Sequence, residues 1–358
     1  MPSLDRRPVV CIAEDRKTCE PALKLLLTSL CHYNADIRIM VFYPAAERIF
    51  VDWAAQFGAN VIDVRTTPLA GAYGWNVKPQ ALLQLLSEGH GDVIWIDSDI
   101  IVTKDIRAAL PSLDSATLVI SEEALWGKRD DARALRARLW GFAVKRSFPF
   151  TLNSAVLRVT HAHTPLLERW KALLESPEYR AAQQLPWNVR PAHMLGDQDV
   201  LTGLLCSKEF SGIPVKILRR GADIIQYFGP YGFTLAERAV CMARGMPTFI
   251  HSQGAKPWLK SNTVEPSGFR RKLEALYLDL SPYTLAAIAL SSSSDRTWTR
   301  PRSAASSTLR NLAFGSPPLA GLPLAAAFDT IRAMVAIRKY LASSQPIHAF
   351  RSLFAGRR

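Results

Sequence analysis

The amino-acid sequence predicts an α/β protein with a Rossmann-like arrangement of strands and helices. Three short apolar segments near the N-terminus alternate with two amphipathic segments, which is typical of parallel strands joined by right-handed helical crossovers. A further apolar segment, residues 93–96, has the composition of a central strand that is covered on both faces. Two carboxylates follow this segment, at the edge where open α/β sheets bind their ligands.

The first half of the chain supplies the alternation. Strands are predicted at Val9–Ala13, at residues 36–43 and at residues 60–64. The helix predicted at residues 17–33 places one apolar stripe at i, i+3, i+4 and i+7, formed by Leu23, Leu26, Leu27 and Leu30. The next helix ends at Gly58, and its predicted inner face consists of Ile49, Phe50, Trp53 and Phe57. No G-x-G-x-x-G sequence follows the first strand, so the dinucleotide fingerprint is absent.

The helix predicted at residues 79–86 leads to the central strand and stops near Gly89. Lys78 lies at the start of this helix, where its ammonium group and the helix N-terminus would both face an anion. A solvated surface lysine is an equally weighted alternative.

The central strand runs directly into Asp97 and Asp99, and the apolar pattern resumes at residues 100–102. Because alternate strand residues share a face, the two carboxylates are expected to point the same way, with Ser98 opposite. Two oxygen ligands on one side suit a hard divalent cation that also binds a diphosphate. The alternative is a strand end followed by a solvated turn.

Four further elements are predicted between residues 118 and 180. A strand is expected at residues 118–121, and a basic helical segment at residues 126–145 contains Arg129, Arg133, Arg136 and Arg138. A solvated helical face explains these arginines best, and a lid over the acceptor is the alternative. The strand at residues 151–159 opens with Asn153 and Ser154, and one helix is expected at residues 164–180.

Two polar clusters follow in the second half of the chain. Asp197, Gln198 and Asp199 come after Gly196 at the start of a helix, where acidic residues either cap the helix or act in catalysis. Further on, an apolar strand runs into the phrase HSQGAKPW. Its histidine, His251, is a competent third ligand for manganese, and its lysine, Lys256, is a suitable charge for a phosphate.

Four phrases, WIDSDIIV, NSAVL, GDQDVLTGLL and HSQGAKPW, resemble the motifs of one enzyme family in this order. They are similar to the metal-dependent glycosyltransferases of the GT-A fold, and in particular to the retaining group of glycogenin and the lipopolysaccharide galactosyltransferases (family 8). The resemblance covers residues 75–258 and implies a single GT-A domain with a mixed central sheet. The chain departs from the family by having one residue between Gly254 and Lys256 instead of two.

The resemblance also implies roles for individual residues. Manganese, or magnesium in its place, would be bound by Asp97, Asp99 and His251. The nucleotide-sugar donor, expected to be UDP-linked, would contact Lys78, Asp97, Ser98, Asn153, Gly254 and Lys256. The two residues beside the reacting anomeric carbon, and therefore in catalysis, would be Asp197 and Gln198.

Composition restricts the partners and the compartment. The net charge of +13 favours an anionic partner, but no nucleic-acid-binding module is present, so nucleic acid is not expected. The five cysteines form no C-x-x-C pair, which favours a reducing compartment. With no signal peptide and no apolar run of 18 residues, the sequence predicts a cytoplasmic protein.

The C-terminal hundred residues are expected to lie outside the catalytic domain, residues 1–260. They divide into a helical extension (261–290), a Ser-rich flexible linker (291–307) and a basic tail (308–358), with a helix at residues 324–341. The segment from residue 261 onward contains 13 Lys or Arg and five Asp or Glu. A solvated or partly disordered tail is preferred, and peripheral contact with a membrane is the alternative.

These observations lead to one functional hypothesis and one rival. The hypothesis is metal-dependent transfer of a sugar from a nucleotide-diphosphate sugar, with retention of configuration, to a glycan, lipid or protein acceptor that the sequence does not specify. The rival is a non-catalytic nucleotide-sugar-binding protein of the same fold.

Overall fold

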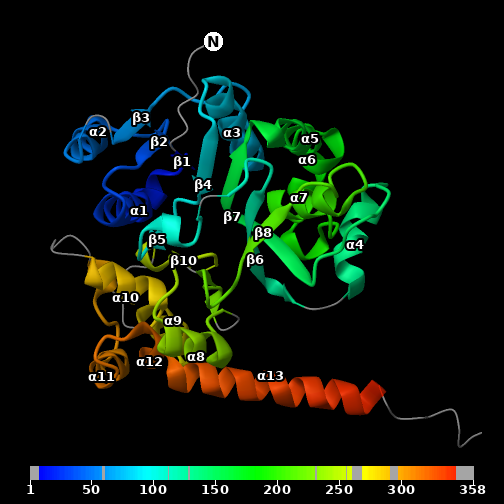
Figure 1. Cartoon of the computed structure of the whole chain (residues 1–358). Helices are drawn as coiled ribbons and strands as arrows, with labels where there is room; N and C mark the ends of the chain where they lie inside the picture. The colour runs from blue at the N-terminus through cyan, green and yellow to red at the C-terminus, as the bar shows by residue number, and fades with distance from the viewer. Residues whose placement is uncertain are drawn as a thin grey trace, which may run out of the picture.

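The computed structural model describes residues 8–58, 61–111, 113–127, 130–229, 232–254, 256–259, 268–290 and 297–343. It contains a seven-stranded sheet and a three-stranded sheet. The order in the large sheet is β3 (Ile62–Arg65), β2 (Arg38–Phe42), β1 (Val9–Ala13), β4 (Asp92–Ile96), β7 (Phe150–Thr160), β6 (Leu118–Gly127) and β8 (Val215–Leu218), and the order in the small sheet is β5 (Ile100–Val102), β10 (Phe249–His251) and β9 (Ile224–Gln226). Figure 1 shows helices on both faces of the large sheet and a group of C-terminal helices against the small one. The α/β architecture predicted from the sequence is confirmed.

The N-terminal half of the large sheet has the predicted alternation. Its elements in chain order are β1 (Val9–Ala13), α1 (Glu20–Tyr33), β2 (Arg38–Phe42), α2 (Arg48–Ala55) and β3 (Ile62–Arg65). The three strands pair in parallel, as helical crossovers require. One detail differs from the prediction: Ile49 is 76% exposed, because α2 begins at Arg48 and turns its first residues to solvent.

The second half of the large sheet contains antiparallel strands. After α3 (Val77–Ser87), β4 (Asp92–Ile96) pairs in parallel with β1, but it pairs antiparallel with β7 (Phe150–Thr160). The strand β6 (Leu118–Gly127) is antiparallel to β7 and parallel to β8 (Val215–Leu218). The sheet is therefore mixed, as the resemblance implied.

The chain changes sheets directly after β4. Residues Ile100–Val102 form β5, which is not a continuation of β4 but pairs antiparallel with β10 (Phe249–His251), and β10 pairs with β9 (Ile224–Gln226). A turn closed by the 3.2 Å hydrogen bond from Ile100 N–H to the Asp97 carbonyl makes the change of direction. The expectation that one strand pattern resumes after Asp99 holds for secondary structure but not for the sheet.

Two apolar clusters cover the two faces of the large sheet. Alternation along β4 sends Val93 and Trp95 into one cluster, with α3 and α5 (Thr164–Leu174), and Ile94 and Ile96 into the other, with α1. Because both faces of β4 are buried, its carboxyl end is the point at which polar side chains first emerge from the core.

The helices between β6 and β8 differ in part from the prediction. Residues 164–180 form two helices, α5 and α6 (Pro177–Gln183), because Ser176 caps α6 and Pro177 begins it. Trp126 belongs to β6, and α4 spans Asp130–Leu139. Arg129 and the side chain of Arg133 lie outside the described residues.

The prediction of a solvated face on α4 is wrong for Arg136. Its guanidinium is 3% exposed and lies 2.6 Å from a carboxylate oxygen of Asp199, on α7 (Asp197–Cys206). An unpaired buried carboxylate is costly, so α7 holds α4 against it through this pair. Arg138 is exposed, as predicted.

The C-terminal helices pack around the small sheet. They are α8 (Leu235–Arg244), α9 (Phe269–Asp279), α10 (Pro282–Ala289), α11 (Ala304–Leu312), α12 (Pro317–Ala320) and α13 (Leu322–Ser343). The expected linker at 291–307 is wrong from Thr297 onward, because Trp298 is buried with Trp258 and Tyr283, and Ser303 caps α11. Residues 291–296 lie outside the described residues.

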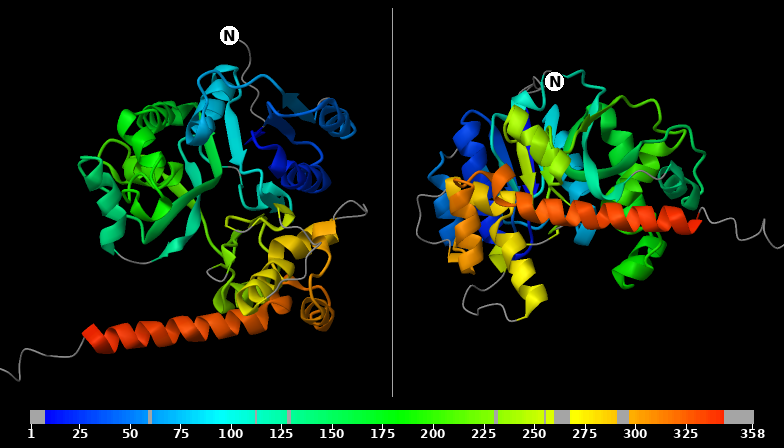
Figure 2. Two further views of the ribbon diagram at one scale, coloured as in Figure 1. Left: turned by 180° about the vertical axis from the view of Figure 1, so that it is seen from behind. Right: turned by 90° about the horizontal axis from the view of Figure 1, so that it is seen from below.

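The long helix α13 contains the helix predicted at residues 324–341. Figures 1 and 2 show it as a straight helix along one edge of the molecule. It is attached near its start, where an Asp329 carboxylate oxygen accepts the Leu235 N–H at 2.9 Å and the Phe328 ring contacts Tyr277. Among the helices of the described ranges, α13 included, none combines the length and apolarity needed to cross a bilayer.

Candidate active site

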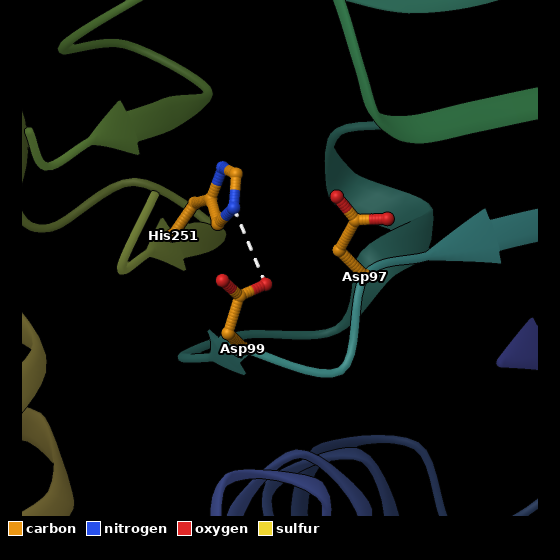
Figure 3. A group of neighbouring side chains, drawn as sticks. All are labelled: Asp97, Asp99 and His251. Atoms are coloured by element: carbon orange, nitrogen blue, oxygen red, sulfur yellow. Dashed lines mark ion pairs between the residues drawn. The ribbon is translucent and has the colours of Figure 1, made fainter. Parts of the chain in front are cut away.

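Three residues from both sheets form a group of possible metal ligands. Asp97 follows β4, Asp99 precedes β5, and His251 ends β10. The antiparallel pairing of β10 with β5 sets His251 opposite Ile100, and one ligand atom from each of the three residues lies within 4.8 Å of the others. Figure 3 shows the side chains converging. The two carboxylates lie close together as expected, but the turn after β4, and not strand alternation, brings them there.

The tautomer of His251 is set by its neighbour on β9. His251 Nδ1 lies 2.6 Å from the Gln226 amide oxygen, which only accepts hydrogen bonds, so Nδ1 carries the proton. The lone pair of Nε2 then faces Asp99, whose Oδ1 lies 3.3 Å away. A neutral imidazole held in this way, with two carboxylates, has the ligand chemistry of a manganese-type or magnesium-type site.

Two lysines neutralise the two carboxylates separately. Lys256 forms an ion pair with Asp99 and also donates to the Ser252 carbonyl at 2.6 Å. Burial disfavours the charged form of Asp99, but the ammonium group of Lys256 outweighs burial and holds the pKa of this carboxyl well below its usual range. Burial raises the pKa of Asp97, against the opposing effect of Lys78.

Lys78 joins the metal-ligand group to the start of α7. Its ammonium nitrogen lies 3.0 Å from Asp97 Oδ1, 3.3 Å from Asp197 Oδ2 and 2.8 Å from the Ser154 hydroxyl. The side chain is 9% exposed, so the solvated-surface alternative is wrong. Burial favours the neutral amine, but Asp197 and Asp97 outweigh this and raise the pKa of Lys78.

The two aspartates of the acidic tripeptide at the start of α7 have different partners. Asp199 caps the helix by accepting the Gly196 N–H at 3.1 Å and pairs with Arg136. Asp197 instead faces Lys78 and accepts a 2.6 Å hydrogen bond from Ser154. The capping role therefore belongs to Asp199, and Asp197 lies among the charged groups around Lys78.

A buried carboxylate that the sequence did not single out lies beside these groups. Glu123, on β6, is 1% exposed and accepts hydrogen bonds from Asn153 (2.7 Å), Gln198 (2.6 Å) and Gln253 (2.9 Å). These three amides come from three of the four phrases that carry the family resemblance. The available signal was the Glu-Glu pair at the end of an apolar strand segment. A carboxylate buried there needs several hydrogen-bond partners, which indicates a polar cluster.

Two further predicted donor residues have structural partners. The Ser98 hydroxyl, in the turn after β4, donates to the buried carboxylate of Glu14 at 2.6 Å. Gly254 lies against the Phe228 ring, where an added Cβ would come within 2.6 Å of a ring carbon. A side chain at position 254 would therefore displace the ring. Neither contact tests the expected role in donor binding.

The site residues form two neighbouring groups. The first holds the charges and contains Lys78, Asp97, Asp99, Asp197, His251 and Lys256. The second is the amide group around Glu123, and it is covalently adjacent to the first, because Asn153 precedes Ser154 and Gln198 follows Asp197.

Comparisons with known proteins identify similar structures only. No family model and no curated protein match the sequence. Among solved structures, the chain is similar to the bifunctional enzyme WbbM (14% identity, TM-score 0.49) over 82% of its length and 53% of that chain. It is also similar to the galactosyltransferase LgtC in complex with donor and acceptor sugar analogs (15% identity, TM-score 0.47), over 80% of its length and 98% of that chain.

A third similar structure is mouse xyloside xylosyltransferase 1, with 14% identity and a TM-score of 0.44 over 69% of this chain and 97% of that chain. All three are glycosyltransferases. This is the class of enzyme that the four sequence phrases resemble.

Proposed function

We propose that the chain transfers a sugar from a nucleotide-diphosphate sugar, UDP-linked by our expectation, to an acceptor. The observation that carries the proposal is the meeting of Asp97, Asp99 and His251 with two lysines at the carboxyl end of a central strand. Carboxylates and an imidazole suit a divalent cation, and lysines beside them suit the phosphates that such a cation binds. Open α/β sheets bind ligands at this edge.

The metal ligands would be Asp97, Asp99 and His251, with manganese favoured over magnesium because an imidazole is among them. A bound cation there stabilises negative charge on the diphosphate leaving group. Lys256 is bound to Asp99 and becomes available to a phosphate when a cation takes over that carboxylate. Lys78 balances Asp97 and Asp197 in place.

The transferred sugar would lie beside the start of α7. Asp197 and Gln198 are proposed to act next to the anomeric carbon, and Asn153 and Glu123 to orient the sugar hydroxyls. Retention of configuration is part of the proposal. In such a reaction the departing phosphate accepts the acceptor proton, so no separate general base is required.

Thermal stabilisation by nucleotide sugars tests donor binding. The cognate donor with manganese should raise the melting temperature, since a ligand at 100 times its Kd stabilises by about 2.7 kcal/mol. Asp97→Asn and Asp99→Asn should remove manganese-dependent donor binding in calorimetry. Asp52→Asn, at an exposed carboxylate on α2, should leave it unchanged. Donor affinity that is the same in all three variants would refute the metal site.

Kinetics separate this proposal from the rival, a non-catalytic binding protein. Asp197→Ala and Gln198→Ala should bind donor within about threefold of the parent, a difference of about 0.7 kcal/mol, yet lose most turnover. NMR of the glycoside should show the anomeric configuration of the donor. A parent protein that binds donor and manganese but turns over no nucleotide sugar supports the rival.

Peripheral membrane contact through the C-terminal region belongs to the same proposal. Beyond its attachment at Asp329, α13 exposes four large apolar residues near two arginines, Arg332 and Arg338: Ile331, Met334, Val335 and Ile337. Apolar side chains with nearby cations suit an anionic lipid surface. Sedimentation with phosphatidylglycerol vesicles should retain the parent and release a double Ile331→Asp, Val335→Asp variant. Equal retention of both would remove this part.

A further inference from the structure

Exposed aromatic residues occupy two loops that lead into the candidate active site. Trp75, in the loop before α3, is 47% exposed, and Trp187, in the loop after α6, is 48% exposed. Tyr73 in the first loop, and Leu185 and Val189 in the second, are also exposed. Large apolar side chains gathered on a surface and bordered by polar groups are typical of a binding site.

The end of α6 joins the two loops into one surface. The Gln183 side-chain oxygen accepts from Trp75 Nε1 at 3.1 Å and from Arg190 at 2.8 Å. The Arg190 guanidinium in turn lies 5.9 Å above the Trp187 ring. Segments more than 100 residues apart in sequence are thus held side by side. We call the surface formed by Tyr73, Trp75, Arg180, Trp187 and Arg190 the aromatic platform.

The rings of the first loop are fixed although they are exposed. Tyr73 donates its hydroxyl to the Leu174 carbonyl at 2.8 Å and accepts from Arg180, whose guanidinium also stacks 4.4 Å from the ring. The indole N–H of Trp75 is bound by Gln183. The polar atoms of both residues therefore have protein partners, while their apolar surface stays in contact with solvent. An immobilised ring loses little conformational entropy when a ligand packs on it.

The platform is continuous with the catalytic groups. Trp75 lies three residues before Lys78, and the Asn76 side chain fixes the loop that carries Trp75 through the Gly71 carbonyl and the Tyr73 N–H. On the other side, Arg190 donates to the Leu195 carbonyl at 3.2 Å, two residues before Asp197. The two chain segments that deliver Lys78 and Asp197 to the active site thus pass through the platform.

We propose that the aromatic platform is the acceptor subsite and that it binds the pyranose rings of a glycan. A pyranose ring presents a face of C–H groups that packs on an aromatic ring, and its hydroxyls need hydrogen-bond partners around that ring. Arg180 supplies N–H groups beside Tyr73, whereas Arg190 uses its N–H groups to bind Gln183, Leu185 and Leu195 and so holds the loop of Trp187 in place. An acyl chain offers no acceptor to the exposed Arg180 guanidinium, whereas sugar hydroxyls do, so a glycan fits better than a lipid tail. The assignment as an acceptor site rests on the proposed function.

Binding of free oligosaccharides tests the platform without requiring turnover. The full-length chain is applied to an array of oligosaccharides, and the one that binds most tightly is titrated by calorimetry. Trp75→Ala and Trp187→Ala should each weaken its binding tenfold or more. Trp75→Phe and Trp187→Phe, which keep a ring, should stay within about threefold of the parent. Phe269→Ala, at an exposed aromatic residue on α9, is the matched control and should bind as the parent does.

An assay of donor binding distinguishes failure of the proposed function from failure of the platform proposal. Manganese-dependent binding of a nucleotide sugar is measured in the same variants and should be unchanged in all of them. If the parent binds an oligosaccharide but no nucleotide sugar, the proposed function fails while the glycan site stands. The platform proposal is overturned if the parent binds no oligosaccharide on the array, or if both Trp→Ala variants bind as tightly as the parent.

Discussion

The side-chain amide of Gln198 donates a 2.6 Å hydrogen bond to Glu123, a carboxylate carried by a different element. Asn153 and Gln253 bind the same carboxylate, so one buried negative charge orients three amides at the proposed sugar site. Amides held in this way keep their remaining polar atoms in fixed directions, which is what discrimination among sugar hydroxyls requires.

Replacing Glu123 by Gln should lower turnover more than donor affinity. The change removes the charge from three hydrogen bonds, and a bond to a charged group contributes about 1.5–3 kcal/mol. A loss of one such contribution in the transition state corresponds to about a 10- to 150-fold lower kcat. Glu122→Gln is the control, because this neighbour faces Arg219. Equal kcat in Glu123→Gln and the parent would contradict an orienting role.

Lys78→Met should destabilise the fold by about 3 kcal/mol, the lower end of the range for a broken buried ion pair because Asp97 is partly exposed. Without the ammonium group, Asp97 and Asp197 face each other uncompensated. Urea unfolding measures the change. Adding Asp197→Asn to Lys78→Met should restore part of the stability, and no recovery in the double variant would argue against the shared ion pair.

His163 should make the protein less stable as the pH falls below about 6.5. Its Nδ1 accepts the Thr160 N–H at 3.0 Å and its Nε2 lies 3.1 Å from the Ala116 carbonyl, so the native ring is neutral. Burial lowers the pKa of His163 from 6.5, and the unfolded chain therefore binds more protons than the native one just below that pH.

Urea unfolding between pH 5 and pH 7 should show this loss of stability in the parent and a shallower pH dependence in His163→Gln. The exposed neighbour provides the control, because His161→Gln should keep the parental dependence. Identical curves for His163→Gln and the parent would show that His163 does not set the pH response.

Trp298→Ala should cost about 3–5 kcal/mol of stability, the range for truncating a large buried aromatic side chain. Trp298 lies 6.5 Å, centroid to centroid, from both Trp258 and Tyr283. Leu312→Ala, at a residue of α11 that is 70% exposed, should change stability by less than about 0.5 kcal/mol. A cost below 1 kcal/mol at Trp298 would mean that the segment beyond residue 297 folds separately.

Local patterns were sufficient to predict much of the architecture. The spacing of Leu23, Leu26, Leu27 and Leu30 defined the stripe of α1 that faces the sheet, and all four are buried. Asp97 and Asp99 do lie close together, although a turn after β4 brings them there and not the alternation from which this was predicted. Such patterns concern neighbours in sequence, and they were reliable where neighbours determine the geometry.

Contacts between segments that are distant in sequence could not be predicted from local patterns. Nothing near Ile100 indicates that β5 joins β10, about 150 residues later, instead of continuing β4. Glu123 was missed because a Glu-Glu pair in a strand usually marks an exposed face, and its three amide partners come from distant segments. Serine-rich composition indicated a linker at 291–307, but burial of the large Trp298 side chain outweighs that composition.

The change of sheets between Ile96 and Ile100 has a mechanical consequence. Asp97 follows β4 of the large sheet, whereas Asp99 precedes β5 and His251 ends β10 of the small sheet. A cation held by all three residues would therefore cross-link the two sheets. Any separation of the two sheets would lengthen the bonds from the cation to the ligands on one of them. Binding of the cation would thus also restrict movement between the two sheets, and the extent of that restriction would depend on the concentration of free metal.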